Sequence, residues 1–120
     1  MGCVYTGLDT RKSVNGSFKI GMTENKTPTS RLTANGLTLL YYVHIPNASK
    51  AELLLMESAM RVAVERMGKK LSGNDYFSYN ARGNKWTPAI QMGKTARDAA
   101  IAVCEQLNLK YYKYKNPKIK

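Results

Sequence analysis

Cysteine and histidine are scarce in this chain, and their scarcity excludes several classes of site. Two cysteines, Cys3 and Cys104, are too few for the disulfide framework of a small secreted domain. The single histidine, His44, leaves no cluster of cysteine and histidine at zinc-ligand spacing. We interpret both cysteines as reduced, buried thiols, Cys3 in a strand and Cys104 on the apolar face of a helix.

Acidic residues and long apolar runs are scarce as well. The 120 residues include 19 Lys and Arg but 8 Asp and Glu, so the net charge is +11 at pH 7. This excess favours a polyanionic partner, because each cation that neutralises a phosphate releases a condensed counterion. An anionic membrane would need a basic amphipathic helix or a lipidation signal, and neither is clear. No apolar run is long enough to span a bilayer, and we expect no signal peptide, no membrane partner and no small-molecule cofactor.

The length and the apolar content of 43% predict a single domain over residues 1–120. The expected fold class is α+β, with a small antiparallel sheet of about three strands flanked by helices and a C-terminal helix. Short runs of β-formers predict paired strands over 3–8 and 18–22, joined through a turn at Asn15-Gly16. The apolar run 37–45 predicts a central strand. Shorter strands are expected at 76–79 and, around Pro88, at 86–92.

Periodicity and capping signals predict three helices. The longest covers residues 50–67, and a short one capped by Thr29 or Ser30 runs through residue 34. The third covers 95–109, where Thr95 and Asp98 approximate a capping box and an unbroken apolar stripe indicates core packing.

Glu57 interrupts the apolar stripe of the predicted helix over 50–67. Leu53 and Val64 share its face at 3.6 residues per turn. A carboxylate in such a stripe is costly unless it is paired, protonated or bound to a metal. Arg61 offers the ordinary explanation, because an i, i+4 ion pair contributes about 0.3–0.5 kcal/mol. We favour a functional role, since such a bridge is more easily built on the solvated side.

Four polar side chains stand on or beside the predicted sheet and can together hydrolyse a phosphodiester: Tyr5, Lys19, Arg31 and Glu57. Glu57 would hold a divalent metal, with Mg²⁺ expected because a hard cation suits one carboxylate, waters and phosphate oxygens. Arg31 would stabilise charge on the scissile phosphate. Tyr5 would take a proton from the attacking water, and Lys19 would assist it or bind the phosphate. The ordinary alternatives are a packing tyrosine and solvated cations.

The order of these residues resembles the GIY-YIG endonuclease superfamily, in a phage-type branch whose second motif reads Lys-Ile-Gly. The resemblance covers residues 2–80 and rests on Cys3-Val4-Tyr5, Lys19-Ile20-Gly21, Arg31 and Glu57. It implies a three-stranded antiparallel sheet flanked by helices, one metal on the glutamate, and DNA cleavage in the cytoplasm of a bacterium or a virus-infected cell.

The chain departs from the family pattern in the first motif, where Cys3-Val4-Tyr5 replaces Gly-Ile-Tyr and keeps the tyrosine, and at two further positions. Lys19 replaces the tyrosine of the second motif, and Arg61 stands where a helix histidine would fall. Asn80 is the candidate for the late asparagine that family members often carry. These departures leave open a non-catalytic nucleic-acid-binding protein on the same scaffold.

Basic residues outside this cluster extend the expected DNA contact. An extension with a helix covers 81–109, and a tail over 110–120 alternates lysine with tyrosine, which suits a backbone held by cations and bases stacked on rings. A frayed, solvated terminus is the ordinary alternative for this tail. The expected contacts are Lys69, Lys70, Arg82, Lys85, Lys110, Lys113 and Lys115.

Overall fold

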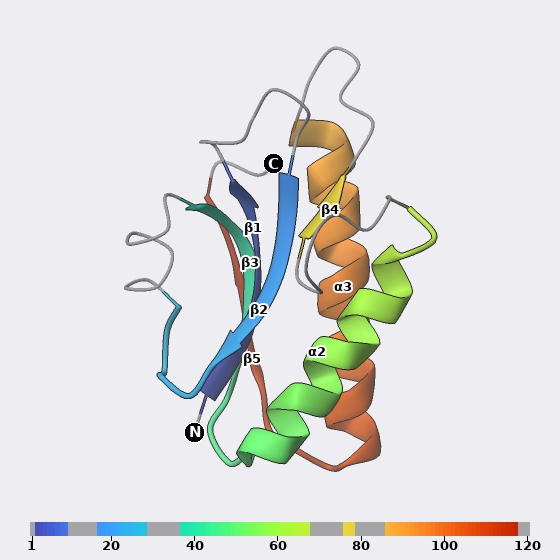
Figure 1. Ribbon diagram of the computed structural model, residues 1–120. Helices are drawn as coiled ribbons and strands as arrows, with labels where there is room; N and C mark the ends of the chain where they lie inside the picture. The colour runs from blue at the N-terminus through green and yellow to red at the C-terminus, as the bar shows by residue number, and fades with distance from the viewer. Residues whose placement is uncertain (1, 10–16, 29–36, 68–75, 79–85, 118–120) are drawn as a thin grey trace.

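The computed structural model describes residues 2–9, 17–28, 37–67, 76–78 and 86–117, and these residues form one sheet and two helices (Figure 1). The elements are β1 (Gly2–Asp9), β2 (Ser17–Thr23), β3 (Leu37–Ile45), α2 (Lys50–Val64), β4 (Tyr76–Ser78), α3 (Trp86–Gln106) and β5 (Tyr112–Lys115). The sheet is antiparallel in the order β4-β2-β1-β3-β5. The predicted α+β class is confirmed, but the described strands number five rather than about three.

Both described helices pack on the same side of the sheet, which we call the helix side (Figure 1). Alternate residues of β1, Val4 and Leu8 among them, enter the core that α2 and α3 cover. The intervening residue Tyr5 belongs instead to a separate cluster with Leu39 and Tyr42. We call this second side the ring side. The sheet therefore separates the helix core from the residues of the ring side.

The predicted pairing of the first two strands is confirmed. β1 is the central strand, and it pairs with β2 so that Tyr5 lies opposite Gly21 and Gly7 opposite Lys19. On its other edge β1 pairs with β3, where the register shifts between Thr6 and Gly7. The hydroxyl of Thr6 accepts a hydrogen bond from the backbone N–H of Tyr41 at 3.2 Å beside this irregularity.

Helix α2 begins at Lys50, as the sequence predicts. Ser49 is its N-cap and forms a reciprocal capping box with Glu52, with hydrogen bonds of 3.2 and 2.9 Å. The helix ends at Val64, earlier than the predicted residue 67. The predicted short helix through residue 34 lies outside the described residues.

The prediction of an edge strand over 86–92 is wrong, because these residues form the first turns of α3. Pro88 falls in the first turn, where a helix has no N–H bond to lose. The later residues Ala89, Met92 and Ala96 are buried at helical spacing against the core. The predicted capping box at Thr95 is also wrong, since the helix already runs through that position.

The end of α3 turns the chain back toward the sheet. Asn108 adopts a left-handed conformation with φ 56°, and the N–H of Leu109 donates to the carbonyl of Cys104 at 2.8 Å. Together with the bond from the N–H of Asn108 to the carbonyl of Glu105, this is a Schellman motif. The predicted C-terminal helix is confirmed, although it starts earlier and ends earlier than the pattern indicates.

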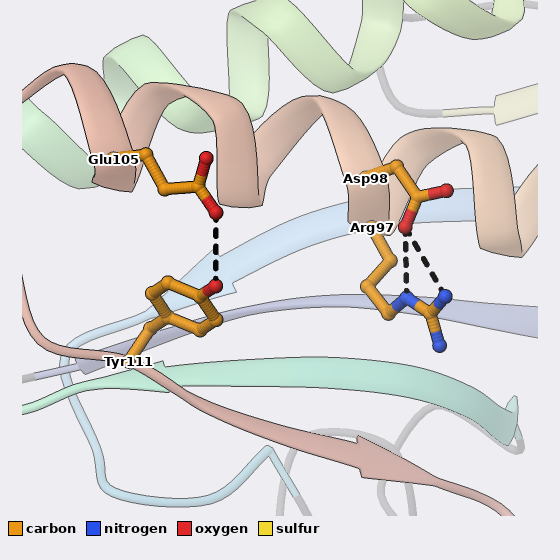
Figure 2. Close-up of polar contacts among 4 residues, drawn as sticks. All are labelled: Arg97, Asp98, Glu105 and Tyr111. Carbon is orange, nitrogen blue, oxygen red and sulfur yellow. Dashed lines mark hydrogen bonds and ion pairs between the residues drawn. The ribbon is translucent and has the colours of Figure 1, made fainter.

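Strand β5 is held at both ends. Before it, the hydroxyl of Tyr111 donates to Oε1 of Glu105 on α3 at 3.1 Å (Figure 2). After it, the side-chain amide of Asn116 donates to the carbonyl of Leu39 at 2.7 Å, and its backbone N–H donates to Leu40 at 2.9 Å. The tail is therefore the outer strand of the sheet through Lys115, rather than a frayed terminus.

Both cysteines are free and buried, as predicted. Burial raises the pKa of the Cys3 thiol to about 12 and that of Cys104 to about 11. The Cys104 sulfur contacts the thioether of Met56 at 3.8 Å, which joins α3 to α2. Among the described residues, no helix has the length and apolar character needed to cross a bilayer.

Candidate nucleic-acid interface

Two of the four predicted catalytic residues share one side of the sheet. Tyr5 and Lys19 both lie on the ring side, because Tyr5 pairs with Gly21 and Lys19 stands two residues before that glycine. The Tyr5 side chain is buried, with 1% of its surface exposed. The phenol therefore packs inside the fold rather than opening onto solvent.

Gly21 explains how this phenol is accommodated. A Cβ added at Gly21 would lie 2.5 Å from both Cζ and Oη of Tyr5. The absence of a side chain thus leaves the space that the ring fills. The tyrosine of the first sequence motif and the glycine of the second are in direct contact, which gives their joint presence a packing reason.

Glu57 lies in α2 on the helix side, so the sheet stands between its carboxylate and the phenol of Tyr5. Its carboxylate forms an ion pair with the Arg61 guanidinium, the ordinary i, i+4 explanation for a carboxylate in this stripe. Twelve per cent of the Glu57 side chain is exposed. The described residues therefore do not gather Tyr5, Lys19 and Glu57 into one cluster.

The predicted metal finds little support in these contacts. The guanidinium of Arg61 already donates to a carboxylate oxygen of Glu57. Within the described ranges, no group of three histidine, cysteine, aspartate or glutamate side chains could hold an ion. Because the Glu57 carboxylate is paired with Arg61 in this structure, we derive no catalytic step through a metal there.

Several predicted site residues lie outside the described residues. They are Arg31, Lys69, Lys70, Asn80, Arg82 and Lys85.

Four aromatic side chains gather at the outer edge of the ring side, on the neighbouring strands β3 and β5. Tyr42 stacks on Tyr114 with ring centroids 4.5 Å apart and planes 19° from parallel. His44 stacks on Tyr112 at 6.1 Å and 24°. We call these four residues the ring face. Strand pairing accounts for both contacts, because Tyr42 is the cross-strand partner of Tyr114 and His44 that of Tyr112.

The ring face lines a hollow with a volume of about 490 Å³. Lys26 and Lys113 also line it. Tyr112 is 54% exposed and Tyr114 is 36% exposed, so both rings reach solvent. The arrangement combines accessible aromatic surface with the cation of Lys26 in one concave site, and Lys113 borders it from the outer strand, which suits a planar, negatively charged ligand.

Hydrogen bonding fixes the polar groups of the ring face. The carbonyl of Gly2 can only accept, so Nδ1 of His44, 3.1 Å away, carries the proton and donates to it. In the neutral imidazole Nε2 is then an acceptor. Burial is the main cause that raises the pKa of the Tyr42 phenol, and the neighbouring Tyr114 adds to the effect. Tyr42 is therefore neutral at physiological pH.

The three tail lysines that were predicted to contact DNA lie at different positions relative to β5. Lys113 and Lys115 lie opposite Val43 and Tyr41, so alternation directs them away from the ring side. Both are exposed because β5 is an outer strand, and Lys113 still borders the hollow. Lys110 is exposed before the strand begins. These lysines form a basic rim beside the rings.

Sequence reasoning singled out the tyrosines of the tail but missed Tyr42, His44 and Lys26. A signal was present in the apolar run over 37–45, where Tyr42 and His44 stand two residues apart and so share a face. Tyr112 and Tyr114 have the same spacing. Two matching pairs of aromatic residues in two strands indicate a common surface, once the strands are known to pair.

Comparisons with protein-family models, with characterised proteins and with solved structures found no match for this chain.

Proposed function

We propose that this protein binds DNA through the ring face and the lysines around it. The observation that carries the proposal is the meeting of exposed stacked rings and cations in one hollow. Aromatic side chains that stack on bases, beside cations that contact the backbone, are the usual composition of a single-strand or loop-binding surface. The resemblance to a phage-type family branch adds the proposal that the protein acts inside a bacterial or virus-infected cell.

The charge of the whole chain supports the same proposal. A net charge of +11 repels itself in a compact protein and attracts polyanions. Within the described part of the chain, neither Lys26 nor Lys113 forms an ion pair. Their ammonium groups are available to phosphates, and each contact would release a condensed counterion.

A salt titration tests this proposal. The fluorescence anisotropy of a labelled DNA oligonucleotide is measured with the unmodified protein at rising salt concentrations. We expect an affinity that falls steeply with salt, and Lys26→Ala and Lys113→Ala each reduce the slope of log affinity against log salt by about 1. Lys94→Ala, on an exposed position of α3, is the matched control and leaves the slope nearly unchanged. Absence of binding at low salt would contradict the proposal.

The endonuclease hypothesis is a second candidate, and one observation favours it. The contact between Tyr5 and Gly21 joins the two motifs on which the resemblance rests, with Lys19 on the same side of the sheet. Cleavage of plasmid DNA with Mg²⁺, compared between the unmodified protein and Glu57→Gln, tests this candidate. Loss of metal-dependent cleavage in the variant would favour an enzyme, and absence of cleavage in both would reject it.

A further inference from the structure

The ring face offers stacking surface at two adjacent positions. Tyr42 with Tyr114 and His44 with Tyr112 are separated by two residues along each strand, about 6.6 Å at the usual rise of a strand. Within each pair, one face of the tail tyrosine is covered by its partner on β3. In the part of the chain that the structure describes, β5 is the outer strand, so no further strand covers the other face of either ring.

The size of the hollow restricts what these rings can receive. Its volume of about 490 Å³ lies within the range of roughly 300–1,000 Å³ that is usual for sites of small ligands. A hollow of that size admits single bases with their sugars, but it is small for a whole duplex. Both described helices lie on the helix side, so neither projects from the ring face into a groove (Figure 1).

Whether the bases are paired or unpaired decides whether they can stack on these rings. In a duplex each base is covered on both faces by its neighbours, whereas an unpaired base has a free face that can stack on tyrosine or histidine. His44 adds a polar group at the hollow, because Nδ1 donates to Gly2 and Nε2 of the neutral imidazole is then an acceptor. That acceptor suits the amino and imino donors of an exposed base edge.

We infer that the ring face binds unpaired DNA, with bases stacked on Tyr112 and Tyr114 and phosphates at Lys26 and Lys113. The inference rests on the proposed function and narrows it from DNA in general to single strands. Base stacking supplies the preference for single strands, and the lysines supply affinity without regard to sequence.

Paired binding measurements test the inference. Anisotropy is measured for a labelled single strand of about ten nucleotides and for the same sequence in a duplex, with the unmodified protein. We expect tighter binding to the single strand. Tyr112→Val and Tyr114→Val keep a residue that favours strands but remove the ring, and each weakens single-strand binding by roughly 5- to 150-fold. Tyr112→Phe and Tyr114→Phe keep the ring and retain most of the affinity.

Val62→Ser is the control, because Val62 is 61% exposed on α2, on the far side of the sheet. It leaves the affinity unchanged. Thermal melting of every variant shows whether the fold is kept.

A second experiment uses the unmodified protein and so does not depend on whether a variant folds. The protein is photo-crosslinked to a single strand carrying 5-iodouracil, and the crosslinked residues are identified by mass spectrometry. Crosslinks at Tyr42, Tyr112 or Tyr114 support the inference.

The outcomes separate the inference from the proposed function. A duplex that binds as tightly as the single strand, or crosslinks that fall only outside the ring face, would overturn the inference and leave DNA binding intact. Valine variants that melt normally and bind the single strand as well as the unmodified protein would also overturn it. Failure of both DNA forms to bind would remove the proposed function and the inference together.

Discussion

Replacing Gly21 with alanine should destabilise the protein through one identified contact. The new Cβ would lie 2.5 Å from Cζ and Oη of Tyr5, a separation that no pair of carbon atoms tolerates without movement. Tyr5 is 1% exposed and packs against Leu39 and Tyr42, so its ring cannot swing into solvent. Overpacking of this kind costs about 1–3 kcal/mol. Alanine recovers about 0.5–1 kcal/mol relative to glycine in a strand, so the net effect runs from about zero to a loss of about 2.5 kcal/mol.

A double-mutant cycle with Tyr5→Leu isolates this contact. Leucine lacks the Cζ and Oη atoms that the new Cβ would meet, so Gly21→Ala in that background should become neutral or stabilising. Urea denaturation followed by circular dichroism gives the free energy of unfolding for all four proteins. A penalty for Gly21→Ala that is equal in both backgrounds would refute the assigned contact. A stabilising effect with Tyr5 intact would refute it more directly.

Three further predictions concern other contacts. Cys3 and Cys104 should resist iodoacetamide at pH 8 in the folded protein and react fully in urea, because burial raises their pKa values to about 12 and about 11; rapid labelling of the folded chain would contradict this. The hydrogen bond to Glu105 on α3 raises the pKa of the Tyr111 phenol above 10, so its stabilising effect is present below pH 10 and is lost as pH rises through the raised pKa; Tyr111→Phe should remove one of the tyrosine transitions above pH 10 in an ultraviolet titration. Glu57→Ala breaks the ion pair with Arg61 and should cost about 0.3–0.5 kcal/mol without weakening DNA binding, as denaturation and anisotropy would show.

The sequence predicted the elements whose signals are local. The hairpin of β1 and β2 was readable from two runs of β-formers around a turn, and the start of α2 from the capping residues before Lys50. Both depend on residues that are neighbours along the chain. Burial of Cys3 and Cys104 followed for the same reason, because each sits in a short apolar pattern.

The errors arose where tertiary contacts decide the structure. Pro88 suggested an edge strand, yet the same residue is compatible with the first turn of a helix, and packing of the following residues on the core selects the helix. The alternation of lysine and tyrosine after residue 110 fits a frayed tail as well as a strand. It becomes a strand because β3 offers an edge and Asn116 and Tyr111 anchor its ends.

In the candidate site, too, local sequence patterns predict some positions and tertiary packing decides the others. The positions of Tyr5 and Lys19 on one side of the sheet follow from strand alternation, which the sequence contains. The separation of Glu57 from Tyr5 and Lys19 does not follow from the sequence, because the side of the sheet on which a helix packs is set by the whole core. The sequence indicated two of the four residues of the ring face, Tyr112 and Tyr114 of the tail. Their partners on β3 could be assigned only after the pairing of β5 with β3 was known.

Nuclear magnetic resonance tests the central claim, that DNA contacts the ring face, most directly. Labelled protein is titrated with a single-stranded oligonucleotide, and shifts of the backbone amide signals are followed. The account predicts that the largest changes fall on the strand residues from Tyr42 to His44 and from Tyr112 to Tyr114, with Lys26. Changes concentrated on the exposed surface of α2 around Leu55 and Val62, with the ring face unaffected, would contradict it.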